Sequence, residues 1–258
     1  DPLASIRFGG GETQASLVIG CDGAKSVVRK SAGLRFEGRD YDAKAISTTV
    51  KLSKPHNGAA RQIFLPRGPM AVLPLKDNRA NLIWTERAAV ADALVALDEA
   101  GFEAELAKKA GAFLPDAKLA GPRHAFGLGL YMAERFHAPR AAIAGDSAHV
   151  IHPLGGQGLN LGLKDVAALV DVIADAGKAG LDIGAESALE PYTRWGRADV
   201  AATAAAMEAF ARVFSGPLPV RLARQLGAQR VIAVDASAHV DRAPPGAERY
   251  LESDLRKQ

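Results

Sequence analysis

The pattern of apolar and polar positions predicts a strand followed by a long helix in the middle of the chain. An apolar run at residues 141–144 has the length and composition of a buried strand. A glycine-rich stretch follows it, and residues 159–176 then carry apolar side chains at helical spacing. These side chains are Leu159, Leu163, Val166, Leu169, Val170 and Ile173. We therefore expect the order strand, acidic turn, glycine-rich loop and helix.

The N-terminal half carries mainly strand signals. Runs at residues 5–8 and 15–20 flank three glycines and predict two paired strands around a glycine turn. A short helix over residues 27–32 should stop at Gly33. From Tyr41 to Thr85, apolar runs separated by turn residues favour a largely antiparallel sheet. Its strands are expected at residues 46–50, 63–65, 70–75 and 80–85.

The rest of the chain predicts helices around one further strand. Residues 88–111 favour two helices, and residues 123–132 favour a strand. Residues 188–214 form one long Ala-rich amphipathic pattern, in which Gly196 costs about 1 kcal/mol relative to alanine. The tail from Gln229 has no clean period, and we expect it to be poorly ordered.

Composition narrows the class of protein. The 258 residues are 48% hydrophobic and 24% charged, which is typical of a globular protein. A net charge of +3 argues against nucleic-acid binding, and the sole cysteine, Cys21, excludes a disulfide framework and fits a reducing cytosol. Asp165, Asp171 and Asp175 interrupt the best apolar run, so no membrane-spanning helix is expected.

The acidic turn and the glycine-rich loop suggest a nucleotide cofactor. Asp146 follows the predicted strand, where its carboxylate can accept hydrogen bonds from a ribityl hydroxyl; an ordinary turn aspartate is the alternative. Residues 156–160 open the helix, and their free N–H groups favour an anionic oxygen or ring. A plain N-terminal cap that includes Asn160 is the alternative there. His149 and His152 have metal-ligand spacing but no matching third ligand, so we expect no metal site.

Four segments in order carry a resemblance to a known family. The sequence GDSAHVIHPLGGQGLNLGLKDVAALVDVI, from residue 145, resembles the second flavin-binding motif of the single-component FAD-dependent aromatic hydroxylases. It is most similar to their ubiquinone-biosynthesis branch, which acts on polyprenylated phenols. LVIGCDGAKSVVRKSAGL (17–34) resembles the family's Asp-Gly motif. Residues 64–85 resemble its substrate-domain sheet, and residues 122–146 resemble the crossover back to the flavin domain.

The resemblance implies which residues contact FAD. They are Asp146, Pro153, Gly155, Gly156, Gln157, Gly158, Leu159, Asn160, Asp22 and Arg29. Asp22 is implied to lie near the FAD pyrophosphate and the route of the nicotinamide. The alternative is that Asp22 caps the short helix and Arg29 is solvated. Cys21 is expected to pack in the interior. No catalytic residue is assigned.

The resemblance also implies an α/β architecture. We expect a partial Rossmann-like FAD domain, an inserted mainly antiparallel substrate sheet, and C-terminal helices. The implied division is residues 1–40 and 133–180 for the FAD domain, 41–132 for the substrate domain, and 181–258 for a helical region. The sequence contains no G-x-G-x-x-G and begins without methionine, so we expect it to enter well inside the flavin domain.

The implied activity is hydroxylation of the ring of a polyprenylated phenol in ubiquinone biosynthesis. The family reduces FAD with NAD(P)H and forms a flavin C4a-hydroperoxide with O₂. Two alternatives stay open: a non-catalytic fragment or scaffold of the same fold, and a hydroxylase of a small soluble aromatic. The implied location is cytoplasmic, with peripheral attachment to the inner membrane or to a quinone-biosynthesis complex compatible with the family. The oligomeric state is open.

Overall fold

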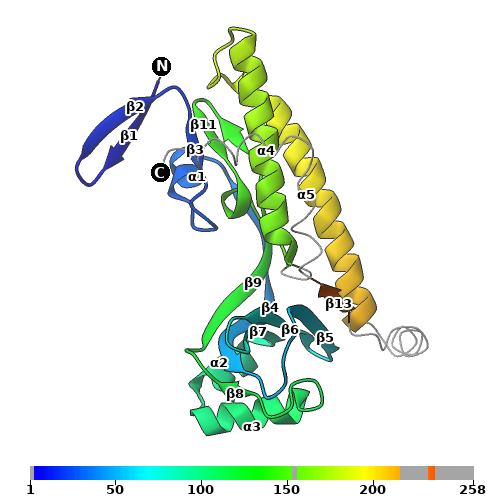
Figure 1. The fold of residues 1–258 in the computed structure, drawn as a ribbon. Helices are drawn as coiled ribbons and strands as arrows, with labels where there is room; N and C mark the ends of the chain where they lie inside the picture. The colour runs from blue at the N-terminus through cyan, green and yellow to red at the C-terminus, as the bar shows by residue number, and fades with distance from the viewer. Residues whose placement is uncertain (1–2, 153–155, 216–231, 236–258) are drawn as a thin grey trace, which may run out of the picture. The chain divides into compact units, whose positions relative to one another are not determined.

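The computed structural model describes residues 3–152, 156–215 and 232–235 (Figure 1). Its contacts divide the chain into two compact units. The first unit contains residues 1–42 and 127–221, and the second contains residues 43–126 and 222–258. The first unit combines a small sheet that contains a parallel strand pair with helices, while an antiparallel sheet dominates the second, so the predicted α/β class is confirmed.

A small sheet in the first unit contains the strand predicted before the acidic turn. This strand, β11 (Ala141–Ile143), is buried throughout and lies between β10 (His137–Ala138) and β3 (Val18–Gly20). The β11–β3 pair is parallel, with Ala142 opposite Ile19. After β3 the chain enters the short helix α1 (Val27–Ser31), as predicted, and Gly33 follows it with φ +67°. The Asp-Gly and Gly-Asp segments therefore follow adjacent parallel strands.

The N-terminal hairpin differs from the prediction. β1 (Ala4–Phe8) pairs with β2 (Gly11–Ala15), whereas the expected partner was residues 15–20. Residues 18–20 belong to the parallel sheet instead. The second hairpin strand has the sequence GETQA and is largely exposed, so it carries no apolar alternation that could have revealed it.

Two long helices complete the described part of the first unit. α4 (Gln157–Lys178) and α5 (Glu186–Ser215) lie side by side in Figure 1. Their core includes buried Leu161, Leu169, Leu189 and Tyr192. Gly196 has a packing role that its helix propensity conceals. A Cβ atom at this position would lie 2.8 Å from the Phe136 ring, so only glycine allows this close contact.

The apolar positions that predicted α4 lie mostly on its exposed face. The exposed fractions of Leu159, Leu163, Val166 and Val170 are 74%, 60%, 45% and 56%. The buried positions are Leu161, Asp165, Leu169 and Ala176. The predicted helix is confirmed, but its buried face contains a carboxylate that the apolar pattern could not show.

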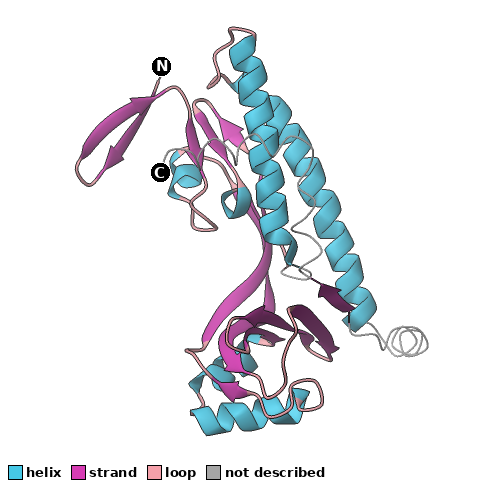
Figure 2. Cartoon of the chain, viewed as in Figure 1, coloured by secondary structure: helices cyan, strands magenta, loops and turns pink. Residues whose placement is uncertain are grey.

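The second unit is built on an antiparallel sheet (Figure 2). The strand order is β4 (Phe36–Lys51), β7 (Arg79–Glu86), β6 (Gly68–Leu75) and β5 (Ala59–Leu65). All four predicted strands are present with wider bounds. β8 (Lys118–Leu119) pairs with β4, and β13 (Ile232–Asp235) pairs with β5. A strand therefore forms within the tail that was expected to lack order; the rest of that tail lies outside the described residues.

Helices α2 (Ala88–Ala96) and α3 (Glu99–Ala110) share an apolar core with this sheet. Trp84 from β7 and Phe102 from α3 are fully buried, with ring centroids 5.9 Å apart. Asp98 caps α3 by accepting a hydrogen bond from the Gly101 amide at 2.8 Å. β9 (His124–Ala133) has residues in both units and pairs in the first with β12 (His149–Val150). No helix in the described ranges is long and apolar enough to cross a bilayer.

Candidate cofactor site

The predicted acidic turn is a single 3₁₀ turn, η1 (Gly145–Ser147), directly after β11. Gly145 has φ +60°, which favours glycine, and the Ala148 amide donates to the Gly145 carbonyl at 2.8 Å. Ser147 and His149 are buried, whereas Asp146 is exposed. No group of the described chain hydrogen-bonds the Asp146 carboxylate. The turn therefore presents a carboxylate that is available to a ligand.

The N-terminus of α4 is open. Gly156 stands at the N-cap in a left-handed conformation, with φ 65° and ψ 26°, and has no side chain that could cap the helix. A Cβ atom at Gly156 or Gly158 would meet no atom of the described residues within 4 Å. Asn160 lies in the first turn of α4, as the alternative of a plain helix start also expects, and its side-chain amide donates to Gln157 Oε1 at 3.4 Å. The uncapped N–H groups can receive an anionic group.

Ser147 joins the two sequence motifs. Its hydroxyl donates to Asp22 Oδ1 at 3.1 Å and accepts from the Gly23 amide at 3.0 Å. Its carbonyl accepts from Arg29 Nη1 at 2.7 Å. The predicted residues Asp22, Arg29 and Asp146 are thus brought together through a residue that the sequence reasoning missed. Only its place beside Asp146 could have drawn attention to it.

Asp22 and Arg29 hold the Asp-Gly loop in shape. Asp22 accepts hydrogen bonds from Ser26 Oγ at 2.5 Å and from the Val27 amide at 2.6 Å, which caps α1. Desolvation raises the pKa of Asp22, but the hydrogen bonds from Ser26 and from the α1 amides outweigh it and lower the pKa to about 2. Arg29 was expected to be solvated if Asp22 capped the helix. It is buried instead, donates to the Ala24 carbonyl at 2.6 Å, and lies 3.8 Å from the Phe36 ring centroid.

A buried ionisable pair lies behind the turn. His149 Nε2 is 2.6 Å from Asp165 Oδ2, and the two side chains are 1% and 2% exposed. The same carboxylate oxygen accepts a hydrogen bond from the Gly145 amide at 2.9 Å. Neither residue was assigned a role from the sequence.

The remaining predicted residues have mixed outcomes. Pro153 and Gly155 lie outside the described residues, and Leu159 is exposed beside the open helix start. Cys21 is exposed, so its expected interior packing is wrong. His152 is partly buried, and its ring centroid lies 5.5 Å from that of Tyr41. Burial lowers the pKa of His152, against an opposing effect of Glu208. The described ranges contain no group of three side chains that could hold a metal ion.

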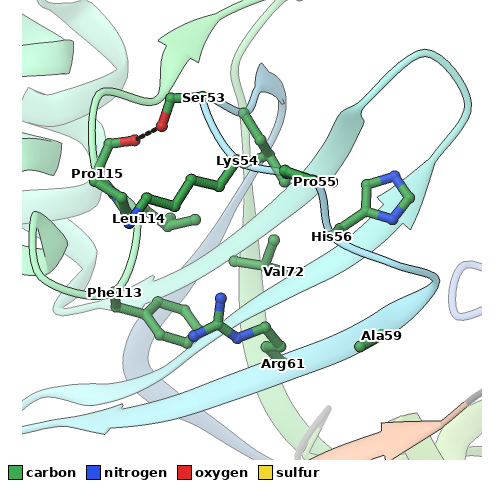
Figure 3. Close-up of a pocket in the computed structure, with 11 residues that line it drawn as sticks. Ser53, Lys54, Pro55, His56, Ala59, Arg61, Val72, Phe113, Leu114 and Pro115 are labelled. Carbon is green, nitrogen blue, oxygen red and sulfur yellow. Dashed lines mark hydrogen bonds between the residues drawn. The ribbon is translucent and has the colours of Figure 1, made fainter.

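A surface pocket of the second unit contains none of these residues (Figure 3). Arg61 packs over the Phe113 ring with its guanidinium carbon 4.8 Å from the centroid, and Ser53 Oγ donates to the Pro115 carbonyl at 2.6 Å. The His56 ring is occupied by the Leu75 carbonyl and the Gly58 amide, at 2.8 and 3.0 Å. None of the residues predicted to contact FAD lines this pocket, so it is separate from the candidate cofactor site.

Comparison with known proteins decides the family. Residues 4–206 match the model of the FAD binding domain. The chain belongs to this FAD-binding family. It is 41% identical over 228 residues to "Ubiquinone hydroxylase UbiL" of Rhodospirillum rubrum, covering 88% of this chain and 53% of the relative. It is 35% identical over 269 residues to the mouse "Ubiquinone biosynthesis monooxygenase COQ6, mitochondrial", covering 90% and 56%.

A solved structure agrees on the fold. The p-nitrophenol 4-monooxygenase PnpA from Pseudomonas putida matches with a TM-score of 0.67 at 23% identity, over 85% of this chain and 56% of that one. The chain spans about half the length of the curated relatives it matches.

The geometry fits the cofactor of this family, FAD. An exposed carboxylate stands at Asp146, and the uncapped start of α4 carries two glycines that face open space. A ribityl chain offers hydroxyl donors to the first, and the pyrimidine edge of a reduced flavin offers negative charge to the second. FAD, predicted from the sequence resemblance, is thus supported by the family and by the form of the site.

Proposed function

We propose that this chain is the flavin-facing part of a monooxygenase that hydroxylates the ring of a polyprenylated phenol in ubiquinone biosynthesis. The observation that supports the proposal best is the pairing of the Gly145–Ser147 turn with the open start of α4. The names of the curated relatives support the pathway.

The residues of the chain bind and orient, while bound FAD, reduced by NAD(P)H, supplies the oxygen chemistry. Asp146 accepts hydrogen bonds from ribityl hydroxyls. The amides of residues 156–160 favour negative charge on the flavin ring, which is electrostatic preorganisation. Asp22 and Arg29 act one step away, because their contacts hold the Asp-Gly loop against Ser147.

The polyprenylated phenol is the proposed substrate, with a small soluble aromatic as the alternative. We expect part of the sheet at residues 64–85 to form the wall of the phenol pocket, as the family resemblance implies. Met207, Phe210 and Phe214 are the proposed wall of the tail exit. Met207 is partly buried, and the other two side chains lie outside the described residues. Peripheral attachment to the inner membrane, where such a substrate dissolves, belongs to the same proposal.

We expect FAD binding to this chain alone to be weak. The sequence lacks the G-x-G-x-x-G that seats a pyrophosphate. A longer protein that supplies a family-type βαβ segment should bind FAD tightly, as a fluorescence titration would show. Stoichiometric FAD on the chain alone after gel filtration would contradict this.

Gly158→Trp tests the cofactor site itself. A side chain at Gly158 meets no protein atom within 4 Å, so the fold should tolerate it, while the indole fills the space proposed for the flavin. Gly177→Trp is the matched control, because Gly177 faces open space on the same helix far from its start. FAD titration should show loss of binding only for Gly158→Trp. Equal FAD affinity of the two variants would mean that the flavin does not bind at the start of α4.

Quinone-precursor profiling tests the substrate. A strain without the gene and any paralogue should accumulate an under-hydroxylated polyprenyl phenol. Normal quinone levels there would refute the pathway and favour a small aromatic substrate.

A further inference from the structure

We infer that Asp165 is a positioning residue that holds the Gly145–His149 turn in its cofactor-binding form, with His149 as its obligatory partner. The inference deepens the proposed function and rests on it, because it concerns how Asp146 is presented to FAD. We call the Asp165 carboxylate with its two donors the clamp.

The Asp165 carboxylate contacts both ends of the turn. Asp165 Oδ2 accepts from the Gly145 amide at 2.9 Å, at the start of the turn, and lies 2.6 Å from His149 Nε2, at its end. The residue presented to solvent, Asp146, lies between these two points. One oxygen atom on α4 therefore fixes the span of the turn.

Close backbone packing brings α4 within reach. A Cβ atom at Gly162 would lie 3.3 Å from Gly145 Cα, which is tighter than ordinary van der Waals contact. Asp165 follows Gly162 by three residues and so lies on the same side of the helix. The small residues at 145 and 162 let the helix approach closely enough for a short Asp side chain to reach the turn.

Because both side chains of the clamp are buried, each depends on the other as its hydrogen-bond partner. Asp165 and His149 are 2% and 1% exposed, so water cannot replace a lost partner easily. His149 Nδ1 meets no hydrogen-bond partner in the described part of the chain, so the ring bonds only through Nε2. Apolar packing could hold this place without an unpaired polar atom. A histidine at position 149 is explained if its Nε2 hydrogen-bonds the Asp165 carboxylate.

Ser147, the other buried polar residue of the turn, bonds the turn to a different part of the unit. Ser147 ties the turn to the Asp-Gly loop, through Asp22 and Gly23. The clamp ties the same turn to α4, whose start forms the other half of the flavin site. Loss of the clamp would leave the turn attached to one side only, and Asp146 would lose its fixed relation to the amides of α4.

Two substitutions at one position test the clamp. Asp165→Asn keeps an oxygen that can accept from both donors, whereas Asp165→Ala removes it. We expect Asp165→Ala to weaken FAD binding by about 10- to 100-fold, the affinity equivalent of losing one charge-assisted hydrogen bond. Asp165→Asn should recover most of that loss. Asp171→Ala, at an exposed position of the same helix, is the control and should bind like the unaltered chain. The affinities come from flavin fluorescence titrations of the longer protein that supplies the βαβ segment.

Hydrogen exchange by NMR separates positioning from general stability. In Asp165→Ala the Gly145 amide should exchange at least about tenfold faster, because it loses its acceptor. The buried Ile143 amide, which donates to the Phe136 carbonyl at 2.9 Å, should keep its rate. Equal acceleration at both amides would show a role in stability alone and overturn the inference, as would unchanged FAD affinity in Asp165→Ala. If the longer protein without a substitution bound no FAD, the proposed binding would fail, and the Gly145 exchange rate would still decide whether the clamp exists.

Discussion

The two units differ in the types of side chain that they bury. The second unit packs Trp84, Phe102, Met70 and other apolar side chains between a sheet and two helices. Its only buried charged side chain among the described residues is Glu86, next to Lys109 at 3.3 Å. The first unit buries Arg29, His149 and Asp165.

This difference follows from how many backbone groups in each interior need a hydrogen-bond partner from a side chain. A regular sheet satisfies its own backbone groups, so apolar packing is enough to stabilise it. The irregular turns after β3 and β11 have backbone groups with no ladder partner, and buried side chains supply the missing partners. Arg29 serves two carbonyls, and Asp165 serves the Gly145 amide. In the first unit, these buried charges lie behind the loops that are proposed to bind the cofactor.

The largest expected effect is in the apolar interior. Trp84→Ala should lower the free energy of unfolding by about 3–5 kcal/mol, because it empties a fully buried site against Phe102. Urea unfolding followed by circular dichroism measures the loss. The control Phe126→Ala removes an exposed ring of the same unit and should change stability by less than about 0.5 kcal/mol. A loss under about 1 kcal/mol for Trp84→Ala would break the contrast between the units.

A smaller loss is expected from the polar interior. Arg29→Leu should cost about 2–3 kcal/mol, since it removes charged hydrogen bonds to the Ser147 and Ala24 carbonyls. It should also weaken FAD binding, because Ser147 adjoins Asp146. Lys30→Leu, at the exposed neighbouring position, is the control for thermal unfolding and FAD titration. If Arg29→Leu left both measurements unchanged, buried charge would not be holding the loop.

The same contrast explains which features could be predicted from the sequence. The strands of the second unit follow from apolar runs between turn residues, and its sheet was predicted correctly. α4 was predicted as a helix, but Leu159 and Leu163 suggested an apolar face that is exposed, while Asp165 lies on the buried one. Periodicity detects a helix and not the face it buries, when a functional carboxylate occupies the interior.

The residues of the candidate cofactor site could be predicted only where they belong to a sequence motif of the family. Asp146 and the glycines of α4 came from the resemblance, and their geometry fits the family. Ser147, His149 and Asp165 act through contacts between segments up to 125 residues apart along the chain, which no local pattern encodes. Likewise, Gly196 looked unfavourable by helix propensity, but its contact with Phe136 requires glycine.

The acid dependence of stability should isolate the charge on Asp22. Its pKa of about 2 in the folded chain lies below the value near 3.9 of an unfolded aspartate. The ionised carboxylate therefore stabilises the fold above about pH 4, and this contribution disappears as the pH falls toward about 2. Because the carboxylate is exposed to solvent, we expect a contribution of about 1 kcal/mol or less.

Asp22→Asn keeps a capping side chain without the charge, so it suits this measurement. Urea midpoints of the two proteins should differ at pH 7 and converge near pH 2. The corresponding pair with Asp171→Asn should show no such convergence. A constant difference between Asp22→Asn and the unaltered chain across this range would mean that the charge contributes nothing.

The smallest effect on stability is expected at Asp146, the residue that is proposed to contact the ribityl chain of FAD. Asp146 is exposed, and the described chain gives its carboxylate no hydrogen-bond partner, so Asp146→Ala should change the free energy of unfolding by less than about 0.5 kcal/mol. In a longer protein that supplies the βαβ segment, the same change should weaken FAD binding by about 1.5–3 kcal/mol, because charge-assisted hydrogen bonds to the ribityl chain are lost. Arg29→Leu should lower both quantities together, whereas Asp146→Ala should separate them. Thermal unfolding and fluorescence titration of the same preparation measure the two. Unchanged FAD affinity in Asp146→Ala would remove the ribityl assignment, and a large loss of stability would mean that its carboxylate supports the turn like the buried residues behind it.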